Sequence, residues 1–171
     1  MKSFRLCFLF LLGASGLWAT DALRRVVPNG TDAEVKVFVA QVTLDLAVGH
    51  RAMFQNSMLW MDEYFADAGT KQSAYRWIQG NCAFDVIILG YVHHGDQLQR
   101  RIDELTGRRS ALVASWAGER VSEIRTQVRE EISKASRTLA ALTRERDLTH
   151  DDLEEFMSSF HSAPERASAG G

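Results

Sequence analysis

The residues of this chain that could do chemistry by type and spacing are few. The most noticeable are two adjacent histidines, His93 and His94, with Asp96 close behind. Imidazole and carboxylate groups together are a common set of metal ligands. Neighbouring side chains on a helix point about 100° apart, so two adjacent histidines do not readily bind one ion. No His-x-x-x-His or Glu-x-x-His pair accompanies them, so the cluster predicts interhelical or surface polar contacts and no metal site.

Other catalytic signatures are missing from the sequence. It contains no Gly-x-Ser-x-Gly nucleophile turn, no phosphate-binding loop and no dinucleotide-binding fingerprint. Serine and histidine residues occur, but nothing in their spacing assembles a catalytic triad. We expect a protein that is not an enzyme and that carries no cofactor.

A run of methionine and aromatic residues could instead bind something apolar. Its members are Met53, Phe54, Met58, Leu59, Trp60, Met61, Tyr64 and Phe65. These positions go most of the way around a helix, so a single seam cannot bury all of them. Glycines at positions 80, 90 and 95 follow in the next segment. Each costs up to about 1 kcal/mol inside a helix, which indicates close helix approach, a kink, or room for something else.

Two interpretations of this run stay open. Methionine is a common filler of irregular cores, so the run can belong to a packed interior. Alternatively, Met58, Met61, Phe65 and Trp77 line an apolar pocket or a groove for a partner helix. In either case we expect Trp60 to continue the main apolar stripe of its helix and Met61 to lie off that stripe.

The first nineteen residues carry the pattern of an export signal. Lys2 and Arg5 precede an apolar run over residues 6–12, and Ala19 offers a small residue at the cleavage edge. The apolar run is too short to span a bilayer, and no later stretch is long enough. The sequence therefore predicts a secreted, extracellular protein with a signal peptide at 1–19 and no membrane span.

Export leaves Cys82 as the one cysteine of the mature chain, because Cys7 departs with the signal. An internal disulfide is then excluded. A buried, inert thiol is one interpretation of Cys82. An intermolecular disulfide is the other, since an odd cysteine in a secreted protein often pairs between chains.

Two further sites depend on export. Asn29-Gly30-Thr31 is the only Asn-x-Ser/Thr sequon, and it predicts glycosylation at Asn29. Arg24-Arg25 lies just after the signal, where a secretory-pathway protease could cut and leave a new N-terminus. The alternative interpretation of this doublet is a pair of solvated charges.

The charge balance argues against nucleic acid as a partner. The 171-residue chain has 20 basic and 22 acidic residues, and losing Lys2 and Arg5 with the signal changes the net charge from −2 to −4. A mildly acidic protein is a poor ligand for nucleic acid or for an anionic membrane. A chain of this length can bury an adequate core without metals or disulfides.

A capping box opens the first predicted helix, which runs from Thr31 to Gly69. The Thr31 hydroxyl can accept the N–H of Glu34, while the Glu34 carboxylate accepts the N–H of Thr31. Residues 42–48 alternate as a strand would, but no turn residue precedes Gly49 and the helical stripe continues past it. We therefore predict a helix, with its stripe at Val35, Val39, Val42, Leu46, Met53, Trp60 and Tyr64.

Two further long helices and a short one are expected. The second runs from residue 70 or 73 to Gly107, the third from Ser110 to 146, and the fourth over 150–161 after a cap at Thr149. Short loops make neighbouring helices antiparallel. The predicted fold is all-α, an elongated antiparallel bundle of three long helices plus a short C-terminal helix. The expected stripes are Trp77, Phe84, Ile88, Tyr91, Leu98, Ile102 and Leu105 in the second helix, Val113, Ala117, Ile124, Val128, Ile132, Ala135, Leu139 and Leu142 in the third, and Leu153, Phe156, Met157 and Phe160 in the fourth.

The predicted plan has four parts: the signal peptide, an N-terminal loop at 20–30, the bundle domain at 31–161 and a disordered tail at 162–171. This general design resembles small secreted helical proteins of insect saliva, haemolymph or reproductive tract. The resemblance covers the export signal, the single sequon, the near absence of cysteine and the helical layout. It implies a binding or signalling role outside cells and transfers no site residues.

These observations lead to one function and one alternative. The first is a secreted, non-enzymatic helical binding protein for a hydrophobic small molecule, such as a lipid or steroid-like hormone, or for a partner helix. The alternative is an extracellular interaction, signalling or structural protein that acts as a homo-oligomer through exposed bundle faces.

Overall fold

The computed structural model describes residues 21–67, 69 and 73–161. The predicted signal peptide and the predicted tail lie outside the described residues. Among these residues all regular elements are α-helices, and a single isolated bridge pairs Val26 with Cys82. The predicted all-helical class is confirmed for this part of the chain.

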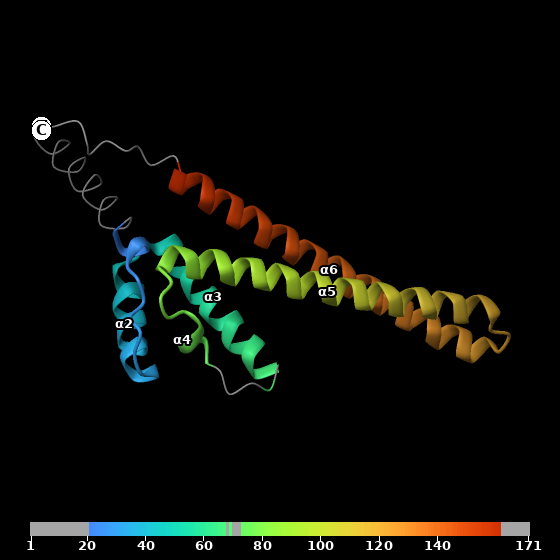
Figure 1. The fold of residues 1–171 in the computed structure, drawn as a ribbon. Helices are drawn as coiled ribbons and strands as arrows, with labels where there is room; N and C mark the ends of the chain where they lie inside the picture. Colours follow the sequence, from blue (N-terminus) through green and yellow to red (C-terminus); the bar gives the residue numbers. More distant parts are fainter. Residues whose placement is uncertain (1–20, 68, 70–72, 162–171) are drawn as a thin grey trace, which may run out of the picture. The chain divides into compact units, whose positions relative to one another are not determined.

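The named helices fall into two compact units. Their order is α2 (Asp32–Asp45), α3 (Val48–Asp67), α4 (Ala74–Trp77), α5 (Ala83–Gly118) and α6 (Ser122–His161) (Figure 1). The boundary between the units falls inside α5, after Val92. Unit 1 contains α2, α3, α4 and the start of α5, and unit 2 contains the rest of α5 and α6. The predicted bundle domain therefore spans parts of both units.

The first predicted helix is two helices, α2 and α3. The capping box is present as predicted: Thr31 N donates to Glu34 Oε2 over 2.8 Å, and Glu34 N donates to Thr31 Oγ1 over 3.4 Å. The chain becomes extended at Leu46, with φ −70° and ψ 144°. Arg51 donates from Nη2 to the carbonyls of Leu44 and Leu46, over 2.9 and 3.2 Å. Because this side chain satisfies the last carbonyls of α2, the helix can stop there, and the prediction of one continuous helix is wrong.

Two glycines turn the chain on either side of α4. Gly69 has φ 62° and donates its N–H to Ala66 O over 3.1 Å, which is the helix-ending role predicted for it. Gly80 has φ 79°, a left-handed conformation that glycine adopts without steric cost. The turn at Gly80 separates α4 from α5, so the second predicted helix is also interrupted.

The long helices of unit 2 run past two predicted stops. α5 continues through Gly107, where nothing lies within 4 Å of the position a Cβ would take. The apolar stripe resumes at Leu112, so packing outweighs the cost of about 1 kcal/mol for one glycine. α6 is continuous over 40 residues. Thr149, the expected cap of a separate helix, donates Oγ1 to Glu145 O over 2.8 Å within α6, so both predicted boundaries are wrong.

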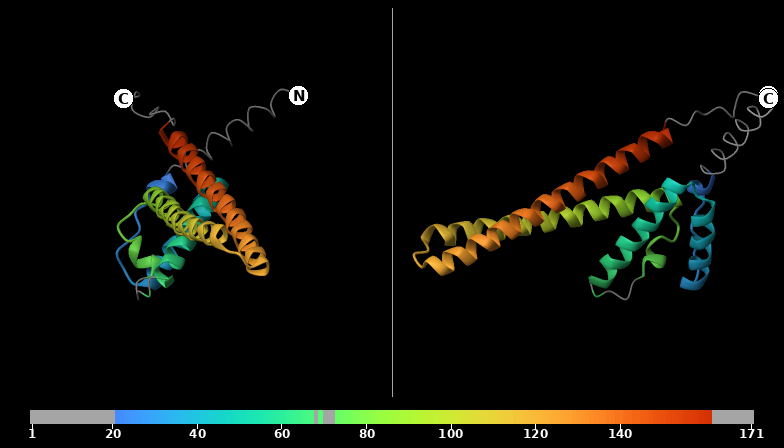
Figure 2. Two further views of the ribbon diagram at one scale, coloured as in Figure 1. Left: turned by 90° about the vertical axis from the view of Figure 1, so that its right-hand side faces the viewer. Right: turned by 180° about the vertical axis from the view of Figure 1, so that it is seen from behind.

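α5 and α6 form an antiparallel hairpin in unit 2, and they lie side by side on the approach to their connecting turn (Figures 1 and 2). The turn covers residues 119–121. Glu119 Oε1 accepts the N–H groups of Arg120 and Val121, both over 2.8 Å. This carboxylate satisfies donors just before the first residues of α6, which fixes a tight connection.

The core of unit 1 gathers apolar side chains from every element of the unit. α4 contacts both α2 and α3 and lies between them (Figure 2). The buried side chains are Ala22, Leu23, Val27, Val35, Val42, Leu46, Phe54, Met58, Met61, Phe65, Ala74, Ile78, Ala83, Val86, Ile87 and Tyr91. No helix in the described part of the chain is long and apolar enough to cross a bilayer.

Candidate functional site

The predicted ligand-binding residues lie in unit 1, and three of the four are buried. Met61 is 0% exposed, and Met58 and Phe65 are each 8% exposed. Trp77, on α4, is half-buried. Such burial is what core packing produces, and it leaves little surface of these three side chains for a ligand. The ligand site remains a prediction.

The two stripes of α3 are the reverse of those expected. Met61 belongs to the buried stripe, whereas Trp60 is half-buried. The Trp60 ring stands edge-on to the ring of Tyr91, with centroids 4.9 Å apart and an angle of 73° between the planes. The helix break at Leu46 explains why the two stripes were exchanged. The expected stripe was counted as if one helix continued through residue 46, but α3 starts in a new direction, so the same spacing no longer selects the buried face.

Close helix approach accounts for one of the three glycines. A Cβ at Gly90 would lie 2.3 Å from Ser57 Cβ and 2.7 Å from Ser57 Cα. Ser57 is completely buried and donates Oγ to Ile87 O over 3.2 Å. α3 and α5 therefore cross at a point where only glycine fits. Gly95 has nothing within 4 Å of a Cβ, so it does not mark a second crossing.

The histidine pair takes part in contacts within unit 2. His94 is largely buried, and its Nε2 lies 3.4 Å from Glu145 Oε1, an ion pair when the imidazole is protonated. Among the described residues, no group of three or more histidine, cysteine, aspartate or glutamate side chains could hold a metal ion. The interhelical contact predicted for this cluster is present.

Cys82 precedes α5 and is tied to its first turn. Its thiol donates to Asp85 Oδ2 over 3.0 Å, and its backbone N–H donates to the same oxygen over 3.3 Å. Burial raises the pKa of the Cys82 thiol, and the hydrogen bond to Asp85 raises it further. A raised pKa lowers the thiolate fraction at neutral pH and slows disulfide exchange. Cys82 is half-buried and so is less buried than the first interpretation expects, and the intermolecular disulfide stays a prediction.

The two sites that depend on export differ in accessibility. Asn29 is exposed. The sequon's Thr31 hydroxyl donates to Glu34 Oε2 over 2.8 Å, and this helix cap lowers the pKa of Glu34, mainly through the Thr31 N–H. Arg25 is half-buried and forms an ion pair with Asp45. Arg25 is therefore more than a solvated charge, whereas Arg24 is exposed.

The α5–α6 hairpin carries a heptad seam. In such a repeat, apolar residues recur at spacings of three and four and interlock between two helices. Leu98 and Ala135 are buried, and the other seam residues are half-buried. The seam consists of Leu98, Ile102, Leu105, Leu112 and Trp116 in α5 and Val128, Ile132, Ala135, Leu139 and Leu142 in α6.

Cross-helix contacts fix the register of this seam. They are Arg125 with its guanidinium 4.5 Å from the Trp116 ring centre, Arg146 Nη1 donating to Gln99 Oε1 over 2.7 Å, and the His94–Glu145 pair. The first of these contacts lies next to the turn, and the last lies at His94, near the start of unit 2. Because they occur at both ends of the seam, α5 and α6 keep one register along it.

A groove runs along one side of the seam between the two helices. It consists of two hollows of about 250 and 380 Å³ that share Leu105, Arg108 and Thr138. Its apolar floor is Leu105, Leu112, Ala135 and Leu142. Its charged rim is Arg101, Glu104, Arg108, Glu131 and Lys134.

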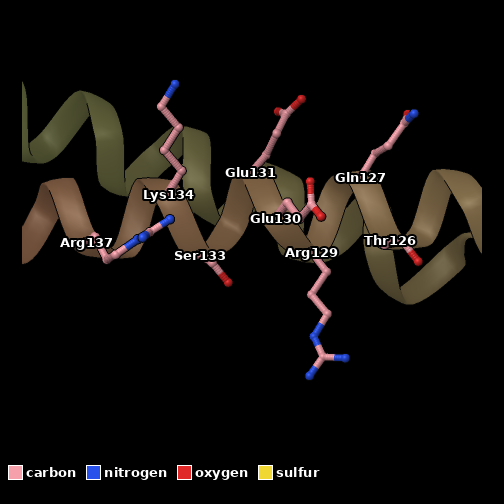
Figure 3. A pocket seen from close by; sticks show the side chains of 8 residues that line it. All are labelled: Thr126, Gln127, Arg129, Glu130, Glu131, Ser133, Lys134 and Arg137. Carbon is pink, nitrogen blue, oxygen red and sulfur yellow. The ribbon is translucent and has the colours of Figure 1, made fainter.

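A larger hollow of about 800 Å³ is lined by α6 alone. Its side chains do not converge: Gln127, Glu131 and Lys134 point to one side of the helix, and Arg129 and Ser133 point to the other (Figure 3). This arrangement is an open helix face and does not enclose a small molecule.

Sequence reasoning found part of the groove and missed the rest. Leu105, Ala135 and Leu142 were among the expected stripe residues, but Leu112 was lost because a stop was expected at Gly107. Val113 and Ile124, expected in the core, are 43% and 44% exposed. The signal that finds the seam is its heptad spacing, which resumes at Leu112 after one position that Arg109 occupies.

Comparison of the chain with models of protein families, with curated proteins and with solved structures finds no match.

Proposed function

We propose that this is a secreted, non-enzymatic helical protein that binds an α-helix of an extracellular partner in the α5–α6 groove. The observation that supports the proposal is the groove itself, with an apolar floor from two helices and a charged rim. Helix-in-groove recognition needs these two features: a hydrophobic channel for the apolar face of the guest and polar edges that select its flanks.

The groove sets the size and chemistry of the guest. It spans residues 101–112 of α5 and 131–142 of α6, roughly 16 Å at 1.5 Å per residue. That length matches about three turns of a guest helix with apolar anchors at i, i+3 or i+4, and i+7. Arg101, Arg108 and Lys134 outnumber the two rim carboxylates, so an acidic flank on the guest is favoured.

The test is a binding screen with synthetic amphipathic helical peptides, followed by fluorescence anisotropy. Peptides with acidic flanks should bind, and Arg101→Glu should weaken them at least about fivefold, since one close charge pair contributes about 1 kcal/mol or more. Arg100→Glu is the matched control, because Arg100 is exposed and does not line the groove. Equal effects of the two variants, or no binding by any amphipathic peptide, would refute the proposal.

A second copy of the chain is the competing guest, as in the alternative function of a homo-oligomer. Sedimentation velocity over a range of concentrations separates the cases. A monomer at every concentration leaves the foreign helix as guest. A dimer that Arg101→Glu dissociates and Arg100→Glu does not would make the partner the protein itself.

Export and glycosylation belong to the same proposal. The cleavable signal at 1–19 and a glycan on the exposed Asn29 are supported by the sequence pattern and by the exposure of that side chain. Expression in cells with a secretory pathway, with N-terminal sequencing and enzymatic deglycosylation of the medium fraction, tests both. Intracellular retention of the full chain would contradict export.

A further inference from the structure

The segment over residues 22–27 is built into unit 1. Ala22, Leu23 and Val27 are each 1% exposed. Val26 pairs with Cys82 in an antiparallel bridge, although its own side chain is 57% exposed. This short segment contributes buried apolar surface on both sides of the Arg24-Arg25 doublet.

Backbone hydrogen bonds join the segment to residues 80–83. Val27 N donates to Asn81 O over 2.9 Å, and Val27 O accepts the N–H of Gly80 over 3.0 Å. Arg25 O accepts the N–H of Ala83 over 3.2 Å. The Arg25 carbonyl of the Arg25–Val26 peptide bond and both backbone groups of Val27 are therefore occupied.

The Arg25 side chain is held as well. Its Nη1 forms an ion pair with Asp45 Oδ2, and both side chains are about one-third exposed, at 38% and 33%. Asp45 lies at the end of α2, where it also accepts hydrogen bonds from Gln41 Nε2 over 3.3 Å. The ion pair thus connects the segment to the end of a helix.

Cleavage by a basic-specific protease needs the opposite of this arrangement. Such enzymes bind an extended segment by pairing with its backbone and by inserting the basic side chain into a pocket. Here the backbone partners are within unit 1, Arg25 is paired with Asp45, and the neighbours Leu23 and Val27 are buried. The bond can be cut only after the segment leaves its place.

We propose that residues 22–27 form a strap that closes unit 1 and makes Arg24-Arg25 a conditional cleavage site, shut in the folded protein and open when the strap detaches. Hydrolysis of the Arg25–Val26 bond adds one water, leaving a carboxylate on Arg25 and an ammonium group on Val26. After the cut the Arg25 carboxylate can still accept the Ala83 N–H, but Ala22 and Leu23 are no longer joined through the chain to Val27. Unit 1 then loses Ala22 and Leu23 from its core.

The experiment is limited digestion of the purified protein with trypsin, with the Arg25–Val26 product followed by mass spectrometry. Native protein should be cut at this bond at least about a hundredfold more slowly than protein in urea, because cleavage follows the population of the open form. Leu23→Ala should speed this cut about tenfold or more by raising that population. Leu59→Ala is the matched control, since Leu59 is 56% exposed on α3.

Hydrogen exchange supplies a readout that does not depend on the protease. The amides of Val27, Gly80 and Ala83 should be protected in the native protein and lose protection together in Leu23→Ala, while amides in α6 stay unchanged. Three results would overturn the proposal: native and unfolded protein cut at equal rates, equal effects of Leu23→Ala and Leu59→Ala, or faster cleavage throughout unit 1 in Leu23→Ala.

Discussion

A missing methyl group at Gly90 decides how closely α3 and α5 approach in unit 1. In Gly90→Ala the new Cβ would meet the Cα of Ser57 at 2.7 Å, so backbone must move. We expect the free energy of unfolding to fall by about 1–3 kcal/mol, measured by urea denaturation. Gly95→Ala is the control, because its Cβ would enter open space; it should be neutral or stabilise by up to about 1 kcal/mol.

Met61 separates the two interpretations of the methionine and aromatic run. As a fully buried side chain, its truncation in Met61→Ala should cost about 2–5 kcal/mol, read as a drop in melting temperature. Leu59→Ala, two residues away on the exposed face, should cost far less. If Met61→Ala instead kept the melting temperature and abolished binding of a lipid or steroid, the predicted ligand site would be supported.

His50 gives unit 1 a pH dependence of known sign. Burial lowers the pKa of His50 below its ordinary value of 6.5, so the unfolded chain binds a proton at a pH where the folded chain does not. The contribution of His50 to stability is then present above about pH 6.5 and is lost as the pH falls toward the folded pKa. Urea titrations between about pH 7.5 and 5 should show falling stability, and His50→Gln should flatten that slope. An identical slope in the variant would contradict the assignment.

At the scale of single elements, the cap of α2 links folding to glycosylation. Thr31→Ala removes the hydroxyl that accepts the Glu34 N–H and should cost about 0.5–2 kcal/mol. It also destroys the Asn29 sequon, whereas Thr31→Ser keeps both. Asn29→Gln separates the effects, because it removes the sequon and keeps the cap. Thermal unfolding and a mobility shift on deglycosylation read the two outcomes, and a stable Thr31→Ala protein would show that the cap is dispensable.

Helix boundaries that neighbouring residues determine could be predicted from the sequence, whereas boundaries that depend on distant contacts could not. The Thr31–Glu34 box and the turn at Gly69 are local patterns, so neighbouring residues alone determine them. The break at Leu46 depends on Arg51 reaching back from the next helix, and no residue at the break announces it. Gly107 was misread for the converse reason, since packing across the seam carries α5 through a residue that would end an isolated helix.

The candidate sites also divide into features that the local sequence predicts and features that depend on contacts between distant residues. The heptad spacing of the groove residues can be counted in the sequence, and only the expected stop at Gly107 hid it. The burial of Met61 could not be predicted, because it depends on the direction α3 takes after the break. The strap was also out of reach, since a segment placed in a loop gave no sign that Val27 would pair with Asn81.

At the scale of the whole molecule, the two units differ in how far apart their contacting residues lie in the chain. The α5–α6 hairpin closes through the turn at 119–121, and its first seam contact joins Trp116 to Arg125. Local contacts of this kind form early, because little chain entropy is lost in closing a short loop. Pulsed hydrogen exchange during refolding should show α5 and α6 amides near the turn protected first and the Val27 amide last. Simultaneous protection would contradict this order.

The position of the strap in the chain also sets a schedule during synthesis. Val27 is translated before its partner Asn81, which lies 54 residues later. At about 5–20 residues per second, this interval lasts roughly 3–10 seconds. Both segments leave the ribosome with the same delay after translation, so Arg24-Arg25 is outside the ribosome for about this interval before the segment that shuts it emerges. Each new molecule therefore passes once through a brief period of exposure, and the speed of elongation through residues 28–83 determines how long that period lasts.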